Sequence, residues 1–478
     1  MYCISLTYGH KTRLIWLLVS VLGVMALQGC GSTSLIDAQS QVRQSFLSGN
    51  LDRSQDLMER FARNNIYRTN DRVLMQLELG ALHYYSGNYE QSMHYFQEAE
   101  LEIDRLFGVS VERNIRALLL NDGQLEYQGE DYEDYMLNLF NALSAVHLND
   151  LEAALVETRR ATFKLESLAI RYDGIVETLS RTDTTKVDTR PPWERGRTNI
   201  QESPFGHYLS YVIYANQGRT DNARIEYERF RRAYGRAFPH RIRNESQLAP
   251  VTSVNAASAA GTSVNAVSEE VARRSAASGS MLPYPEPGNV LLLGFGGRAP
   301  EKKSNELRIY SNDLSTYIKY AVPSLRQHRS RIRSVEAVIN DTLTVPMPML
   351  DDFALIAEDV FNVRKPLIVT RAIIRSTLKY IGSQATQRAI RDEYGADAGR
   401  LAGLITGIFT EVSEEADLRA WQTMPGQVYG QTVSLPEGTH HVRIRYLGNN
   451  RMLLHETEQN VESVSERPLQ IREAFYWN

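Results

Sequence analysis

The sequence predicts a multidomain α+β protein, with an α-helical repeat domain in its N-terminal half and a mixed α+β domain at its C-terminal end. Amphipathic helical patterns extend from about Leu35 to His240. The composition then changes between Gln247 and Ser280 to small and polar residues, and strand-like apolar runs begin at Asn289. We therefore expect four segments: a signal peptide (1–29), a helical repeat domain (30–245), an Ala/Ser-rich flexible linker (246–287) and an α+β domain (288–478).

The N-terminal segment has the pattern of a lipoprotein signal peptide. Lys11 and Arg13 precede the apolar run from Leu14 to Ala26, which is shorter than the roughly 20 residues of a membrane-spanning helix. Leu27-Gln28-Gly29-Cys30 then resembles the lipobox of bacterial lipoproteins, in which small residues precede the cysteine that receives the diacylglyceryl group. We expect Cys30 to become the acylated first residue of the mature protein. An N-terminal anchor helix is the alternative.

The cysteines and the net charge indicate where the protein is located and which ligands it is unsuited to bind. It has two cysteines, and removal of Cys3 with the signal peptide leaves Cys30 alone, so no intrachain disulfide is possible. Gly31 follows, where enterobacterial lipoproteins retained at the inner membrane have aspartate. We expect a lipid anchor in the outer membrane, on its periplasmic face. The formal net charge of -4 gives no electrostatic basis for nucleic-acid binding.

The helical half contains three matches to the spacing of tetratricopeptide-like helix pairs. In such pairs small residues lie where two helices approach closely, a glycine or asparagine forms the turn, and aromatic residues fill the gaps. The matched small residues Ser92, Ala154 and Ala223 are about two repeat lengths apart, so intervening units are degenerate or replaced by insertions. An irregular helical bundle is the alternative. The three matches are Gly80, Tyr84, Gly87, Tyr89, Ser92, Phe96 and Ala99; Ala142, Ala145, Asn149, Leu151, Ala154, Thr158 and Ala161; and Tyr211, Tyr214, Gly218, Ala223, Tyr227 and Phe230.

The C-terminal part alternates strand and helix patterns. Strands are expected at Asn289–Phe295, Ser334–Ile339, Thr342–Val345, Gln427–Leu435, Thr439–Tyr446 and Arg451–His455, in a mostly antiparallel sheet. The two strands on either side of Pro436-Glu437-Gly438 are predicted to form a hairpin. Asn449-Asn450 is predicted to form another turn. Helices are expected at Asp351–Asn362 and from about Leu367 to Phe409. In the second, Gly395, Gly399, Gly403 and Gly407 share one face, which favours close packing, or alternatively an interfacial segment.

Several motifs are weak candidates for chemistry. Asp131, Glu133 and Asp134 after Glu130 suggest a cation or acid–base site, but acidic residues also favour a helix N-terminus, which is the simpler interpretation. The Gly294–Gly297 segment lacks the ending of a phosphate loop and predicts a tight turn. Two basic runs, Arg224–Arg243 and Arg326–Arg333, are either solvated faces or surfaces for anionic lipid, lipopolysaccharide or peptidoglycan. We predict no catalytic, cofactor-binding or metal-binding residue.

Five short motifs follow one another in a fixed order along the chain. They are Tyr127-x-Gly129-Glu130-x-Tyr132-Glu133, Asn138-Leu139-x-Asn141-Ala142-Leu143, Asp150-Leu151-Glu152-Ala153-Ala154, Ser203-Pro204-Phe205-x-x-Tyr208-Leu209-Ser210 and Ala416-Asp417-x-Arg419-x-Trp421-x-x-x-Pro425. This ordered set resembles a family of largely uncharacterised proteobacterial lipoproteins with tetratricopeptide-like N-terminal halves. The similarity covers most of the mature chain, and the Ala/Ser-rich linker looks like an insertion. The resemblance implies an envelope location, no established catalytic residues and an association with lipoprotein activators of cell-wall synthases.

These observations favour a non-enzymatic, lipid-anchored scaffold or adaptor that binds another envelope protein, in cell-wall synthesis or surface assembly. Tyr84, Tyr127 and Tyr211 are the candidate partner-binding residues, because a stack of helix pairs usually offers a concave binding face. The alternative is a peptidoglycan- or polysaccharide-acting enzyme or binding module in the C-terminal domain, using carboxylates such as Asp417. In the structural interpretation, Trp421 packs in the core and Asp417 pairs with Arg419 or caps a helix.

Overall fold

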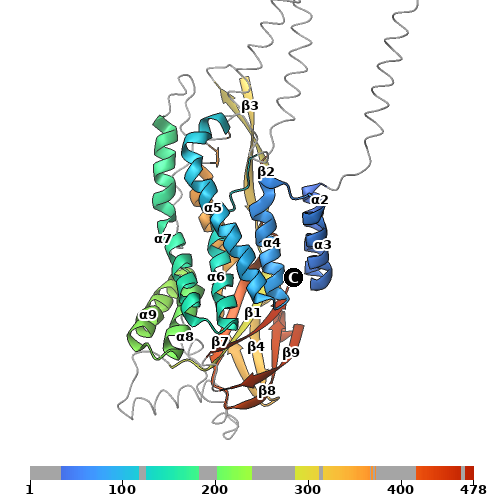
Figure 1. The fold of residues 1–478 in the computed structure, drawn as a ribbon, viewed down its shortest axis with the longest axis vertical. Coiled ribbons are helices and arrows are strands. Elements are labelled where there is room, and N and C mark those ends of the chain that lie inside the picture. The colour runs from blue at the N-terminus through green and yellow to red at the C-terminus, as the bar shows by residue number, and fades with distance from the viewer. Residues whose placement is uncertain are drawn as a thin grey trace, which may run out of the picture.

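The computed structural model has a helical half packed against several β-sheets (Figure 1). It describes residues 34–117, 125–181, 202–239, 286–311, 316–366, 368–369, 372, 416–464 and 469–477. The signal peptide with Cys30, most of the expected linker and the four spaced glycines from Gly395 to Gly407 lie outside these residues. The predicted mixed α+β class is confirmed, and the predicted domain boundaries stay predictions.

The helices follow one another as pairs joined by short turns. They are α2 (Leu35–Leu47) and α3 (Leu51–Arg63), α4 (Arg72–Tyr85) and α5 (Tyr89–Ala117), α6 (Asp131–His147) and α7 (Leu151–Arg181), and α8 (Pro204–Asn216) and α9 (Thr220–Ala237), with a short 3₁₀ helix, η1 (Thr69–Asp71), before α4. The last three pairs coincide with the three stretches that the small-residue spacing singled out. Gly87, Asn149 and Gly218 have positive φ angles of 77°, 61° and 70°, so the predicted turn residues adopt the left-handed conformation that ends a helix.

The close contact predicted at Gly80 is present. A Cβ atom at this position would lie 2.8 Å from the ring of Phe96, so α4 and α5 approach at a distance that only glycine permits. No additional helix pair separates the three matched pairs among the described residues. Part of the chain between the matched small residues is accounted for by the long helices α5 and α7, which have 29 and 31 residues.

The C-terminal part forms three sheets in the described ranges. Their strand orders are β10-β1-β7-β6, β2-β3 and β5-β4-β8-β9, and the β1–β10 pair is parallel while the others are antiparallel. A helix over residues 353–366 follows β6. The strands are β1 (Val290–Arg298), β2 (Glu301–Ser311), β3 (Thr316–Arg326), β4 (Ser334–Ile339), β5 (Leu343–Met347), β6 (Met349–Asp352), β7 (Pro425–Val433), β8 (Gly438–Leu447), β9 (Leu453–Ser463) and β10 (Gln470–Tyr476).

The predicted hairpin around Pro436-Glu437-Gly438 is wrong. β7 pairs with β1 and β6, whereas β8 pairs with β4 and β9, so the chain passes from one sheet to another at this turn. The turn expected at Asn449-Asn450 is present, because Asn450 has a φ of 53° between β8 and β9. The β2–β3 hairpin and β10 have no counterpart among the expected strands.

The two halves share one buried core. Phe140 of α6 lies 6.1 Å from Phe295 of β1, and Tyr85 of α4 lies 5.0 Å from Phe475 of β10, between ring centroids. Figure 1 shows the β2–β3 hairpin rising alongside the helices, and Lys302 of β2 pairs there with Glu130 before α6. The helices therefore pack directly on the sheets of the same chain.

Candidate functional site

The three tyrosines expected to bind a partner are buried. Tyr84, Tyr127 and Tyr211 are 1%, 3% and 0% exposed. The Tyr84 hydroxyl donates a hydrogen bond to Glu473 of β10, and the Tyr127 hydroxyl donates one to Glu133 at 2.7 Å. The expectation that these rings form a surface for another protein is therefore wrong for this conformation, because they pack inside the chain itself.

A C-terminal segment, residues 416–424, contributes to this burial. We call it the closing segment. The Trp421 ring is 2% exposed and lies 5.5 Å from Phe96 and 5.8 Å from Phe140, between centroids. Tyr85 of α4 donates a hydrogen bond from its hydroxyl to the carbonyl of Thr423 at 2.8 Å. The face of α4–α6 toward the sheets is therefore occupied by the same chain.

Two buried glutamates hold the backbone of the closing segment. Glu133 accepts a hydrogen bond from the Trp421 amide, and Glu78 accepts one from the Gln422 amide, both at 2.7 Å. Burial raises the pKa of each carboxyl to about 7, against the opposing effect of these hydrogen bonds. Glu133 also forms a capping box with Glu130 at the start of α6, so the interpretation of this acidic cluster as a helix N-terminus is confirmed.

Asp417, the carboxylate considered for catalysis, has a structural role. Both of its oxygens accept hydrogen bonds from Arg419, at 2.8 and 2.9 Å, and Arg419 also contacts Asp71 at 2.9 Å. Burial alone would raise the pKa of Asp417, but Arg419 and Lys302 hold it below its ordinary value. The carboxylate therefore stays ionised as the partner of Arg419. The structural interpretation of Asp417 and Trp421 is confirmed.

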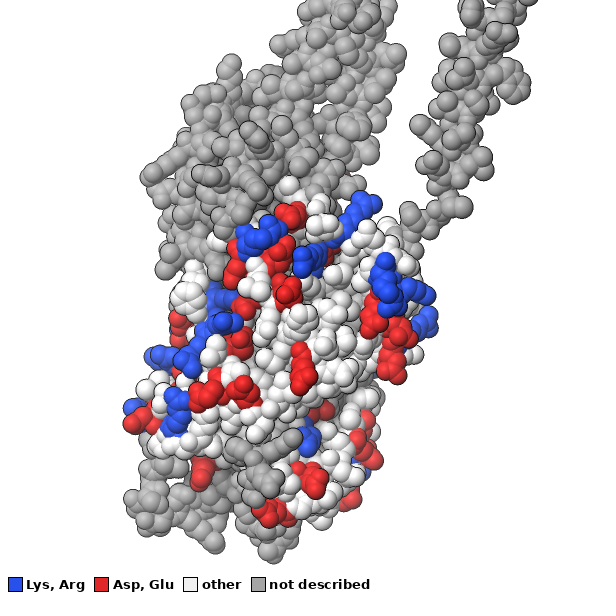
Figure 2. Space-filling model, in the orientation of Figure 1, with Lys and Arg blue, Asp and Glu red and all other residues white. Residues whose placement is uncertain are grey.

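The two basic runs differ in whether their charges are neutralised. On α9, Arg224, Arg229 and Arg236 each pair with a glutamate, which is typical of a solvated helix face. Figure 2 shows the same mixing of basic and acidic side chains over the helices. In the second run, between β3 and β4, no carboxylate pairs with any of the four arginines among the described residues; these are Arg326, Arg329, Arg331 and Arg333.

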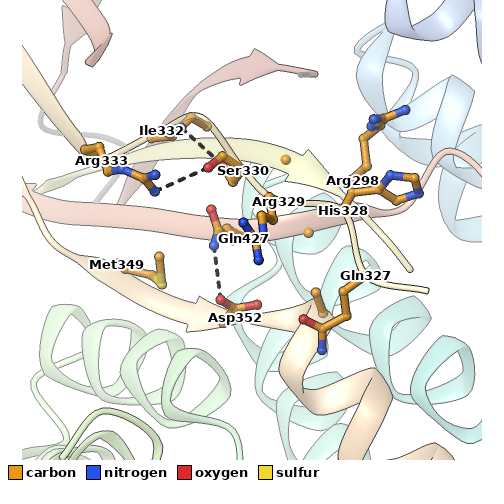
Figure 3. Close-up of a pocket in the computed structure, with 13 residues that line it drawn as sticks. Arg298, Gln327, His328, Arg329, Ser330, Ile332, Arg333, Met349, Asp352 and Gln427 are labelled. Carbon is orange, nitrogen blue, oxygen red and sulfur yellow. Dashed lines mark hydrogen bonds between the residues drawn. The ribbon is translucent and has the colours of Figure 1, made fainter. Parts of the chain in front are cut away.

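The second basic run lines a pocket in the described part of the chain. This pocket has a volume of about 300 Å³ and is formed by the loop over residues 327–333, the end of β1 at Arg298, β6 and the start of β7. Figure 3 shows the Arg329 guanidinium beside Gln427 and Asp352, with Arg333 on one side and Arg298 and His328 together on the other. We call it the basic pocket.

The described lining of the basic pocket has one carboxylate, Asp352, and three arginines, Arg298, Arg329 and Arg333. The Asp352 oxygens already accept hydrogen bonds from the Leu355 amide, at 3.2 Å, and from the Gln427 side chain, at 3.0 Å. Burial and the neighbouring Arg298 lower the pKa of His328, with Glu301 opposing them, so this imidazole is neutral at pH 7. The lining therefore keeps an excess of positive charge, which can attract an anion.

In the part of the chain that the structure describes, no helix has the length and apolar character of a membrane span, and no group of three or more His, Cys, Asp or Glu side chains is placed to hold a metal ion. Comparisons with protein-family models, curated proteins and solved structures found no match.

Part of the basic pocket was visible in the sequence. The run Arg326–Arg333 was a candidate anionic-ligand surface. The tight turn predicted at Gly294–Gly297 is wrong, because these residues belong to β1, where Gly294 and Gly296 pair with both β7 and β10. Gly297, with a φ of 68°, lines the pocket from that strand. Sequence reasoning missed Arg298, Asp352 and Gln427. These three residues come together because β1, β6 and β7 belong to one sheet, and no local sequence pattern indicates that strand order.

Proposed function

We propose that the chain is a lipid-anchored, non-enzymatic adaptor of the bacterial envelope that binds an envelope component in the basic pocket. The observation that carries this proposal is the pocket itself, a hollow whose described lining has three arginines and one carboxylate, Asp352. The lipobox ending at Cys30 supports the membrane anchor, in the outer membrane and on its periplasmic face. The component belongs to cell-wall synthesis or surface assembly.

The helical half, in this proposal, is a tetratricopeptide-like array that holds the sheets of its own chain. Three successive helix pairs with positive-φ turns support the repeat assignment. The closing segment and β10 occupy the face of α4–α6 that lies toward the sheets. Another envelope component therefore binds at the C-terminal part of the chain in this proposal. This favours the binding-module alternative over a partner bound between the helices.

Photocrosslinking in living cells tests the proposal. A photoreactive amino acid replaces Gln327 at the pocket or, as a control, Phe163, an exposed side chain on α7. We expect one recurrent envelope component to be captured from position 327 and not from 163. Capture from position 163 alone, or from neither position, would contradict the proposed role of the pocket.

A further inference from the structure

We infer that the basic pocket binds an oxyanion group, a phosphate or carboxylate, carried on a larger molecule. The inference rests on the proposed function and adds the chemical class of the ligand. Arginine guanidinium groups present several N–H donors in a planar fork, which matches the oxygens of phosphate and carboxylate groups.

Arg333 is positioned by neutral acceptors. Its Nε donates a hydrogen bond to the Asn449 side chain at 3.1 Å, and its Nη1 donates one to the Ser330 carbonyl at 3.3 Å. These bonds fix the direction of the guanidinium without cancelling its charge. Figure 3 shows the resulting bond toward Ser330, with the rest of the group at the pocket wall. A charged ligand oxygen can therefore meet an arginine that is already oriented.

Arg298 leaves a buried donor unpaired. Its Nε atom is buried and has no hydrogen-bond partner. Because this atom is buried, Arg298 acts on the pocket through the charge of its guanidinium and not through a direct hydrogen bond from Nε to a ligand. Arg298 lies next to His328, whose pKa it lowers, which indicates that the positive field of the guanidinium reaches this part of the pocket.

The acidic side chain in the described lining is already engaged. Asp352 caps the N-terminal end of the helix over residues 353–366 and accepts a hydrogen bond from Gln427. The volume of about 300 Å³ is at the lower end of the roughly 300–1,000 Å³ range of small-molecule sites. It exceeds one phosphate group, so we expect the ligand to continue beyond its anionic group.

The test measures binding to the full lipidated chain in uncharged detergent. Inorganic phosphate and acetate are titrated calorimetrically, and phosphatidylglycerol vesicles are compared with phosphatidylcholine vesicles by co-sedimentation. The pocket variant carries Arg329→Gln and Arg333→Gln. The control variant carries Arg224→Gln and Arg229→Gln, which removes the same formal charge from arginines that are paired on α9.

We expect the pocket variant to lose at least about tenfold in affinity, because hydrogen bonds to charged groups are each worth about that factor, and the control to change less than about twofold. Binding of inorganic phosphate or acetate indicates a free or polymer-borne anion, whereas binding of phosphatidylglycerol vesicles alone indicates a lipid head group. Equal losses in both variants, or binding to none of the probes, would overturn the inference. Crosslinking from position 327 that persists in the pocket variant would also overturn it while leaving the proposed function intact.

Discussion

The pH dependence of stability tests the contact between the closing segment and the helices. Glu78 of α4 is 1% exposed, and its two oxygens accept hydrogen bonds from the Gln422 amide and the Thr423 hydroxyl, both at 2.7 Å. Burial raises the pKa of Glu78 from 4.5 to about 7. We chose Glu78→Gln because glutamine keeps the size of the side chain and one acceptor oxygen but cannot ionise.

The sign follows from proton binding. Between pH 4.5 and about 7 the folded chain keeps a proton on Glu78 that the unfolded chain releases, so the stability from this group is complete below pH 4.5 and is lost as pH rises through 7. A pKa difference of about 2.5, at about 1.4 kcal/mol for each pKa unit, corresponds to about 3.5 kcal/mol over the whole titration. Glu78→Gln removes this loss. It also places an amide donor at Thr423, which costs stability at every pH.

Urea unfolding of wild type and Glu78→Gln at pH 5 and pH 8, followed by tryptophan fluorescence, checks the prediction. We expect the variant to gain about 2.5 kcal/mol relative to wild type between pH 5 and pH 8, because part of the difference is already lost between pH 4.5 and pH 5. Glu228→Gln, an exposed glutamate on α9, is the control and should not show this gain. An unchanged difference between wild type and Glu78→Gln at the two pH values would refute the argument that burial controls this carboxyl.

Three further perturbations test other parts of the molecule. Trp421→Ala should lower the free energy of unfolding by about 3–5 kcal/mol, because the ring is buried against two phenylalanines, and a loss below about 1 kcal/mol in a denaturant titration would contradict that packing. Gly80→Ala should cost about 1–3 kcal/mol because its Cβ would lie 2.8 Å from Phe96, while Gly206→Ala, whose nearest contact is 3.6 Å, should be neutral or stabilising; melting temperatures in the opposite order would show that the α4–α5 contact is not limiting. Cys30→Ala should abolish labelling by radioactive palmitate and release the protein from the membrane fraction, and a labelled variant would exclude Cys30 as the acylated residue.

The helical half was predictable because its determinants are local. The spacing identified Gly87, Asn149 and Gly218 as turn residues followed by amphipathic patterns. All three have the positive φ angles that such turns require. Gly80 and Ser92 were assigned to close contacts for a similar reason, since small residues recur where helices meet. What local spacing did not reveal is that the inner face is filled from residues 416–424, more than 300 positions away.

The sheets were predicted less completely because their pairing is long-range. The parallel pairing of Val290 with Gln470 and the crossing from β7 to β8 are set by the packing of three sheets, so an alternating pattern around Pro436 gave the wrong partner. The β2–β3 hairpin was missed because lysines dominate the start of β2 and Pro323 interrupts β3, and both features argue against a strand. The basic run was visible, but not the pocket that it lines.

Hydrogen exchange tests most directly the claim that the basic pocket is the contact face. The full chain is measured in membrane fragments of the cells that produce it and again after extraction into uncharged detergent, and the amides over residues 326–333 are compared with those of α7. We predict that the 326–333 amides exchange more slowly in the membrane fragments and that α7 exchanges equally in both. Slower exchange confined to α7, with residues 326–333 unchanged, would contradict the account.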